Sequence, residues 1–470
     1  MKLNFDLYDY NWNDLNWLNF RNEVMRNKKS VPLNIYEIDL ASWKTRYGKT
    51  NKYGDSFLNY REIAGDLITY LKEMGYTHIS VLPKNYRYEL LSMPDSRFGD
   101  PNDFMCFVDE LHRSGIGIII DLITFRKPVS SIPKDTEVVT EEDEFYVPDE
   151  KLLSEFLRYA SHWIENYHVD GIRCEIDCLI GCEPEAADIL SRLNEAIFTK
   201  YPDILTVSML SDQSRVSYAE NCGFSLVQNS NVSQGLFEFG GCDPYFRKYH
   251  HDKIVLQGSE ISEGFVFPVT HLDVSVGRKS LLDKMFGLYE DKFACYRALM
   301  CHVTALPGKK MMFMGGEFGQ FREWDPENQL EWFILDYDMH RKLKNFVADI
   351  NDFYLKTPEL CGNFRWINKT DSERNVVSYS RNNDDGEVVC VMNFSGVDIV
   401  NYYVYVEKPG TYDVLLNSDE SYYGGSGMFR VNSVHTDTDI NGGHYLSLNL
   451  AKLSGMFLRR VDKSARNVFI

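Results

Sequence analysis

Short apolar runs rich in β-forming residues recur between residues 33 and 314, and segments with helical periodicity separate them. This alternation is typical of parallel strands that are joined by helices. Eight such runs predict an α/β fold, a closed (β/α)8 TIM barrel. The runs expected to form strands are 33–40, 78–82, 115–122, 171–175, 205–209, 224–228, 265–269 and 310–314.

Two of the connecting segments indicate where helices begin and end. Asp100 can cap a helix that starts at Pro101. A preceding helix is expected to end at Gly75, directly before the second strand. Apolar residues recur at helical spacing in both segments, which predicts that each helix packs one face on the sheet. These residues are Ile63, Leu67, Leu71 and Met74 in one segment and Phe104, Phe107, Val108 and Leu111 in the other.

The pattern changes after about residue 365, where apolar and polar residues alternate with a period of two between Gly and Asn turns. Clear examples are 388–394, 402–406, 412–416 and 445–450. This pattern predicts a C-terminal antiparallel β-sandwich. We therefore expect three parts: an N-terminal arm over 1–30, the barrel over 31–365 and an all-β domain over 366–470.

Charge and composition exclude several classes of partner. The formal net charge of -19 repels phosphate backbones and anionic lipid, so neither nucleic acid nor a membrane is an expected partner. The start of the chain does not resemble a secretion signal, and no apolar run approaches the roughly 18 residues of a membrane span. The ten cysteines are scattered, which is typical of reduced thiols in the cytoplasm. The spacing of Cys174, Cys178 and Cys182 does not complete a zinc set, so we expect no metal and no cofactor.

Four segments, in order along the chain, resemble segments of bacterial glycogen branching enzymes, members of the α-amylase superfamily of glycoside hydrolases. The segments are 32–44 (PLNIYEIDLASWK), 96–104 (SRFGDPNDF), 170–173 (DGIR) and 307–324 (PGKKMMFMGGEFGQFREW). The last of them is the most specific. The resemblance extends from about residue 30 to the YYGG sequence at 422–425, and therefore covers most of the chain.

The resemblance implies a retaining transferase that cuts an α-1,4 glucan, holds the fragment covalently and rejoins it through an α-1,6 bond. Such chemistry needs a nucleophilic carboxylate and a carboxylic acid about 5 to 5.5 Å apart. In the family these are an Asp after strand four and a Glu after strand five, aided by an Asp after strand seven. Chemistry in such barrels takes place at the carboxyl ends of the strands.

Matched position by position, all three catalytic slots have changed in this chain. Glu175 stands in the nucleophile slot in place of Asp, so its carboxylate extends one methylene too far. Leu210 stands in the slot of the proton donor, and Leu272 stands in the slot of the stabilising Asp. Because leucine cannot donate a proton, the matched positions predict that catalysis has been lost.

Residues that contact the sugar in the family are partly changed as well. Arg126 stands where a His is expected, and Leu91 and Ser92 stand where a Tyr is expected. The substrate-binding positions that keep their expected identities are Asp121, Arg173 and His271.

Exposed aromatic rings suit the faces of pyranose sugars, and three aromatic residues are candidates for this role. They are Trp324, Tyr422 and Tyr423. Packing in a core is an equally good interpretation of each ring.

Structural interpretations of the changed and retained positions remain open. Glu175 and Arg173 lie two apart on a strand, project to the same side and could pair with each other. Leu210 and Leu272 could fill the centre of the site with apolar groups. Asp121, Arg173 and His271 could be a hydrogen-bond scaffold that persists with the fold.

The favoured hypothesis is a branching-enzyme-like protein of α-glucan metabolism that binds α-glucan, or a glucan-metabolising enzyme, without catalysis. A second hypothesis is an active α-glucan branching enzyme or hydrolase whose acid comes from elsewhere, with Asp177, Asp212 and Asp273 near the barrel mouth. A third is an interaction scaffold with no affinity for sugar.

Overall fold

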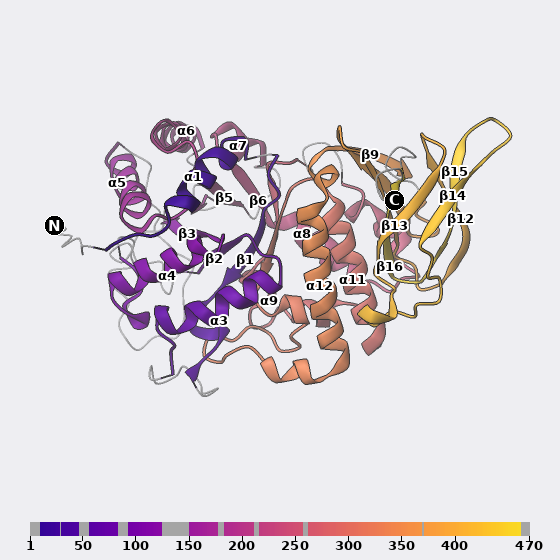
Figure 1. Ribbon diagram of the computed structural model, residues 1–470, viewed down its shortest axis with the longest axis horizontal. Coiled ribbons are helices and arrows are strands. Elements are labelled where there is room, and N and C mark those ends of the chain that lie inside the picture. Colours follow the sequence, from indigo (N-terminus) through magenta and orange to yellow (C-terminus); the bar gives the residue numbers. More distant parts are fainter. Residues whose placement is uncertain are drawn as a thin grey trace, which may run out of the picture. The chain divides into compact units, whose positions relative to one another are not determined.

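The barrel is built from strands that the apolar runs predicted. The computed structural model describes residues 10–28, 30–46, 56–82, 93–124, 150–176, 183–210, 216–256, 262–368 and 371–461. Within these residues, strands β1 to β8 form a closed parallel barrel in sequence order, which confirms the predicted α/β barrel. Figure 1 labels β1, β2, β3, β5 and β6 of this barrel. The strands are β1 Asn34–Ile38, β2 His78–Val81, β3 Gly117–Thr124, β4 Gly171–Glu175, β5 Leu205–Leu210, β6 Leu226–Asn229, β7 Phe265–Val269 and β8 Lys309–Phe313. Only β4 and β7 have the predicted bounds at both ends; the other six differ by one or two residues at one or both ends.

Helices precede and connect these strands, and one long helix leads from the barrel to the C-terminal sheet. The helices are α1 Leu15–Val24, α2 Leu40–Trp43, α3 Tyr60–Glu73, α4 Pro101–Arg113, α5 Glu150–Tyr167, α6 Glu183–Lys200, α7 Val216–Asn221, α8 Ser230–Gly241, α9 His271–Val274, α10 Leu281–Lys284, α11 Tyr289–Ala305 and α12 Asp338–Lys356.

The signals for helix ends in the sequence act as expected. Asp100 and Asp103 form a capping box at the start of α4, with Pro101 in the first turn. Gly75 follows α3 with φ of 70°, a conformation that glycine adopts at little cost. Both predicted apolar stripes are buried, so these helices lie where their periodicity placed them. The buried stripe residues are Ile63, Leu67, Leu71, Met74, Phe104, Phe107, Val108 and Leu111.

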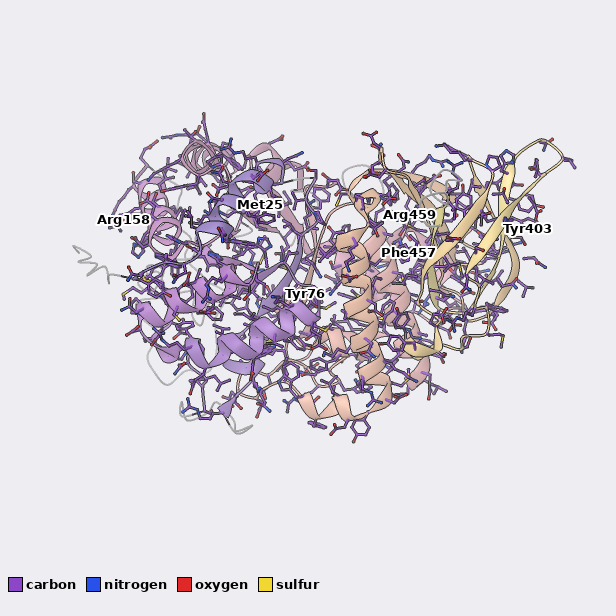
Figure 2. All side chains as sticks on the ribbon, viewed as in Figure 1. Met25, Tyr76, Arg158, Tyr403, Phe457 and Arg459 are labelled. Atoms are coloured by element: carbon purple, nitrogen blue, oxygen red, sulfur yellow. The ribbon has the colours of Figure 1, made fainter. Side chains whose placement is uncertain are left out.

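The C-terminal sheet has eight strands in the order β12-β15-β14-β13-β16-β11-β10-β9, and its described pairs are antiparallel. Its core contains side chains from strands of both halves of this order, which is the packing of a sandwich. The hydroxyl of Tyr402 on β12 accepts a hydrogen bond from the side-chain amide of Asn368 on β9 at 2.9 Å, which links the two ends of this strand order. Phe457, labelled in Figure 2, packs on Phe353 of α12 with ring centroids 4.8 Å apart. The strands are β9 Asn363–Asn368, β10 Val376–Asn382, β11 Glu387–Asn393, β12 Ile399–Val406, β13 Thr411–Asn417, β14 Ser433–Thr438, β15 His444–Leu450 and β16 Ser454–Arg460.

The chain divides into two compact units. One comprises Met1–Asn231, Gly264–Pro268 and Asp325–Leu330, and the other comprises Val232–Glu263, Val269–Trp324 and Glu331–Ile470. Among the residues that the structure describes, no helix is both long enough and apolar enough to span a membrane.

A buried charge network joins the N-terminal segment to the rest of the first unit. Asp170, directly before β4, accepts hydrogen bonds from Trp17 and Arg21 of α1, each at 2.8 Å. His112 of α4 lies 2.9 Å from Asp170 on one side and 2.9 Å from Asp14 on the other. Burial alone would raise the pKa of Asp170, but His112 and Arg21 outweigh burial and hold this pKa well below its usual range.

We expect Asp170→Asn to lower the free energy of unfolding by about 3 to 5 kcal/mol, because it removes the buried carboxylate that Arg21 and His112 share and leaves each of them with one anion instead of two. Urea unfolding followed by circular dichroism measures this loss. Glu110→Gln is the matched control, since it removes the anion of an exposed pair with Arg113 and should change stability by less than about 1 kcal/mol. Equal losses in the two variants would contradict the importance of the network.

His302, at the end of α11, is a buried neutral imidazole in the second unit. Its Nε2 lies 3.0 Å from the carbonyl oxygen of Ile254, and its Nδ1 lies 3.0 Å from the hydroxyl of Tyr379. The carbonyl can only accept, so Nε2 carries the proton and Nδ1 accepts from the tyrosine. Burial lowers the pKa of His302 from 6.5 to about 3.

This lowered pKa makes the protein less stable in acid. Between pH 6.5 and about 3 the unfolded chain binds a proton at this position and the folded chain does not, so stability falls as the pH falls through this range. We expect His302→Gln to reduce the dependence of the urea midpoint on pH between about pH 6.5 and 4. Tyr379→Phe keeps the buried imidazole and should keep the dependence. An unchanged slope in His302→Gln would show that other groups cause the acid sensitivity.

Candidate functional site

The centre of the first unit's part of the barrel is organised around the guanidinium of Arg173 on β4. Its Nε and Nη2 donate to the two carboxylate oxygens of Asp121 on β3, at 2.5 and 2.7 Å. Its Nη1 donates to Glu37 on β1 at 2.6 Å and lies 3.4 Å from the amide oxygen of Gln228 on β6. These contacts place Arg173 inside the barrel, bridging several strands.

The single positive charge of Arg173 faces two carboxylates in an environment that is almost closed to solvent. The side chains of Arg173 and Glu37 are 1% and 0% exposed, and that of Asp121 is 10% exposed. Burial alone would lower the pKa of Arg173, but the carboxylates of Asp121 and Glu37 outweigh burial and raise it. Arg173 therefore stays charged, and its two hydrogen bonds to Asp121 have the geometry that makes such pairs strong.

Glu37 is a site residue that the sequence reasoning missed. A signal was present, because Glu37 is a charged residue between the apolar neighbours Tyr36 and Ile38 in the run that forms β1. A charge in a strand buried on both faces needs a partner of opposite charge. The pairing of Glu37 with Arg173 supplies this partner across the barrel.

Glu175, the expected nucleophile position, is the last residue of β4. It is half-buried and lies in register with Thr124 on β3 and Met209 on β5. Because side chains alternate along a strand, Glu175 projects to the same side as Arg173. The carboxylate thus belongs to the interior side of the barrel, one layer nearer its carboxyl end.

The expected acid position, Leu210, is the last residue of β5. The residue before it, Met209, is 8% exposed and lies in register with both Glu175 and Gln228. Gln228 contacts Arg173 inside the barrel, and residues in register on parallel strands project to the same side. The strand register therefore places Met209 beside Glu175. Neither Met209 nor Leu210 has an ionisable group.

The expected stabilising position lies on α9, the short helix after β7. Leu272 is 53% exposed, so its side chain does not lie in a filled core. The next residue, Asp273, forms a capping box with Thr270: its Oδ2 accepts from the backbone N–H of Thr270 at 2.8 Å and from its hydroxyl at 3.1 Å. The carboxylate at this turn is therefore engaged in starting the helix.

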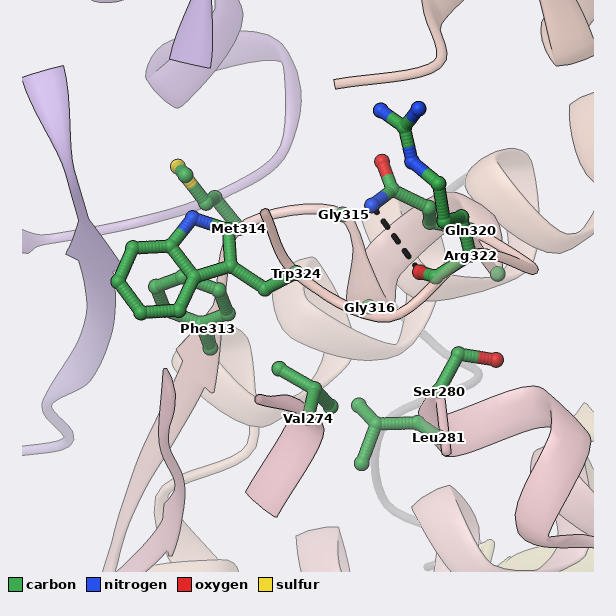
Figure 3. Close-up of a pocket in the computed structure, with 11 residues that line it drawn as sticks. Val274, Ser280, Leu281, Phe313, Met314, Gly315, Gly316, Gln320, Arg322 and Trp324 are labelled. Carbon is green, nitrogen blue, oxygen red and sulfur yellow. Dashed lines mark hydrogen bonds between the residues drawn. The ribbon is translucent and has the colours of Figure 1, made fainter. Parts of the chain in front are cut away.

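His271 and Trp324 lie together in the second unit. Their rings meet edge to face with centroids 5.7 Å apart, and Trp324 packs on Phe313 at 5.3 Å. The backbone N–H of Trp324 donates to the carbonyl of Val274 at 2.7 Å, which ties its loop to α9. Trp324 and Phe313 form one side of a pocket whose other side carries Gln320 and Arg322 (Figure 3).

The other two aromatic candidates differ in their contacts. Tyr423 donates its hydroxyl to Asp349 at 2.8 Å and packs edge to face on Phe346, so much of its ring serves packing. The neighbouring Tyr422 is 59% exposed and remains open to solvent.

Several predicted positions fall outside the described residues: Leu91, Ser92, Arg126, Asp177, Cys178, Cys182 and Asp212. Among the residues that are described, no cluster of three or more His, Cys, Asp or Glu side chains could hold a metal ion. The described cysteines, Cys174 included, are free thiols.

Comparisons with known proteins give a consistent result. Residues 366–461 match the family model of the alpha amylase C-terminal all-beta domain. The 1,4-alpha-glucan branching enzyme GlgB of Aquifex aeolicus is 33% identical over a match that covers 96% of this chain and 80% of that enzyme. GlgB of Halothermothrix orenii is 34% identical, with 90% and 75% covered. The alpha-amylase of Geobacillus thermoleovorans, solved with acarbose, has the same fold with a TM-score of 0.66 at 14% identity, covering 93% of this chain and 99% of that one.

We expect Arg173→Met to lower the free energy of unfolding by about 3 to 5 kcal/mol, because Glu37 and Asp121 then lose their buried cation. Thermal and urea unfolding measure the loss. The double variant Arg173→Met/Glu37→Gln should recover part of it, since one of the unpaired carboxylates is gone. A double variant that is less stable than Arg173→Met would contradict this electrostatic account.

Proposed function

Because this chain belongs to the 1,4-α-glucan branching enzyme family, within the α-amylase superfamily, we propose that it binds α-glucan and has lost the family's bond-forming chemistry. The names of its relatives support α-glucan as the ligand class. The observation that carries the loss of catalysis is the absence of an ionisable side chain at Met209 and Leu210, next to Glu175 on the neighbouring strand.

The acid step carries most of the argument. A retaining mechanism needs a proton delivered to the leaving oxygen while a carboxylate attacks the sugar from the other side. A thioether and an aliphatic side chain cannot deliver this proton, and removal of a general acid costs about 10² to 10⁴ in rate. Neither Met209 nor Leu210 can supply the proton, whichever of the two occupies the acid position.

The other two changed positions add to the loss. Glu175 carries its carboxylate one methylene beyond the length of Asp, and a displacement on the order of 1 Å at a reacting centre can cost about a hundredfold. Leu272 offers no charge to the transition state, and Asp273 beside it is engaged as a helix cap. The active-enzyme hypothesis therefore has little support at the position of the stabilising Asp.

We propose that Asp121, Arg173 and His271 are retained as a scaffold. Arg173 is paired on two sides by carboxylates, and His271 packs on Trp324. These contacts support the shape of the barrel mouth independently of any reaction. Trp324 remains a candidate sugar contact, because it forms part of the pocket wall.

The proposed location is the cytoplasm, because the ten cysteines are scattered along the chain, which is typical of reduced thiols. A glucan-metabolising enzyme is a second proposed partner. The proposed location and the proposed enzyme partner are both compatible with α-glucan as the ligand.

A branch-linkage assay on amylose tests the loss of catalysis. We expect the wild-type chain and Glu175→Gln to show the same background level of branch formation, because both lack the general acid. Retarded migration of the wild-type chain in a glycogen gel is the expected sign of glucan binding. Branching that Glu175→Gln abolishes would establish an active enzyme, and unretarded migration would favour the sugar-independent scaffold.

Two matched variants locate the acid position. In a background of Glu175→Asp and Leu272→Asp, we expect Met209→Glu to raise branching above the wild-type level and Leu210→Glu to leave it at background. The reason is that Met209 is in register with residue 175. The reverse result would place the acid position at residue 210.

A further inference from the structure

The outer face of the C-terminal sheet carries a group of three neighbouring tyrosines. On β12, Tyr402, Val404 and Val406 belong to the core, so Tyr403 and Tyr405 project outward. On β15, Leu446 and Leu448 belong to the core, so Tyr445 also projects outward. Tyr403 and Tyr405 are 53% and 49% exposed. Tyr403 is labelled on this sheet in Figure 2. We call Tyr403, Tyr405 and Tyr445 the tyrosine platform.

Contacts within the sheet hold the platform in place. Tyr405 and Tyr445 lie directly opposite each other in the antiparallel register, with ring centroids 5.8 Å apart. Tyr403 lies diagonal to Tyr445, with centroids 4.7 Å apart. The hydroxyl of Tyr405 donates to Asp439 at 3.2 Å, and Asp439 is itself fixed by backbone N–H groups of its turn. The tyrosine rings would therefore lose little conformational freedom when a ligand binds.

Polar groups surround the rings. Ser447 lies opposite Tyr403, and Asp437 on β14 lies opposite Tyr445. A hydroxyl and two carboxylates, those of Asp437 and Asp439, thus border three aromatic faces. Aromatic rings pack on the C–H faces of sugars, and carboxylates accept hydrogen bonds from hydroxyl groups.

This chemistry favours one class of occupant. The carboxylates and the net charge of -19 repel phosphates and other anions. An apolar protein surface would desolvate the carboxylates of Asp437 and Asp439 without offering them hydrogen-bond donors in place of water, which costs free energy. A neutral chain of hydroxyl-rich sugar rings satisfies both the aromatic and the acidic parts of the face.

We infer that the tyrosine platform is a glucan-binding surface separate from the barrel. The inference rests on the proposed function, because it takes α-glucan as the sugar. It assigns the binding to a named surface, so the chain holds glucan through the sheet even when the barrel centre does not react.

Affinity electrophoresis of the full chain in glycogen gels, with titration by maltoheptaose, tests this inference. We expect the triple variant Tyr403→Ala/Tyr405→Ala/Tyr445→Ala to bind about tenfold or more weakly than the wild type, because removal of clustered aromatic anchors has effects of this size. Tyr405→Phe keeps the ring and loses only the bond to Asp439, so it should keep most of the affinity.

The matched control removes exposed tyrosines elsewhere in the same unit. Tyr245 and Tyr249 are 73% and 67% exposed, and Tyr245→Ala/Tyr249→Ala should leave the retardation unchanged. Unaltered thermal unfolding of the triple variant shows that its sheet is intact; if the triple variant unfolds, the three single alanine variants replace it.

The outcomes separate the inference from the proposed function. If the wild type is retarded and the triple variant is retarded equally, the platform does not bind glucan, but the proposed function stands. If the wild type is not retarded, both are overturned. If the wild type dimerises without glucan and the triple variant is monomeric, the platform is an interface between two copies and the inference is wrong.

Discussion

A buried cation that bridges several barrel strands is the constraint on which the candidate site depends. Arg173 cannot be buried without anions, and Asp121 and Glu37 supply them from β3 and β1. This arrangement fixes the side to which alternate residues of β4 project. It therefore also fixes the position of Glu175, which lies one layer nearer the carboxyl end of the barrel than the guanidinium.

The same constraint explains how catalysis can be lost while the fold persists. The groups that stabilise the centre are paired with one another, whereas the groups at the strand ends would act on a substrate. Replacing a proton donor by a thioether or an aliphatic chain leaves the ion pairs of Arg173 untouched. The buried ion pairs that stabilise the barrel and the groups that would carry acid–base chemistry thus lie in different layers of the barrel. Selection can therefore act on one set without the other.

Much of this architecture is readable from the sequence because burial repeats with a fixed period. The bounds of β4 and β7 follow directly from their apolar runs. In the C-terminal domain β9, β10, β14 and β16 were not singled out. The residues of β9 and β14 are mostly half-buried or exposed and those of β10 and β16 are mostly buried, so none of these strands alternates clearly. Glu37 was missed because its partner is 136 residues away, and the choice between Met209 and Leu210 requires the register of β5 with β4. Long-range pairing and register are set by tertiary contacts, which local patterns do not contain.

A protein that keeps a substrate without reacting with it needs affinity that does not depend on the reacting positions. Interactions realised only in the transition state contribute to rate, while uniform interactions contribute to binding. In the proposed function, the changed positions Glu175 and Leu272 remove the first kind, and a rigid aromatic face such as that of Tyr403 and Tyr445 provides the second. On this proposal, loss of the acid does not weaken glucan binding, because the two functions use chemically different side chains.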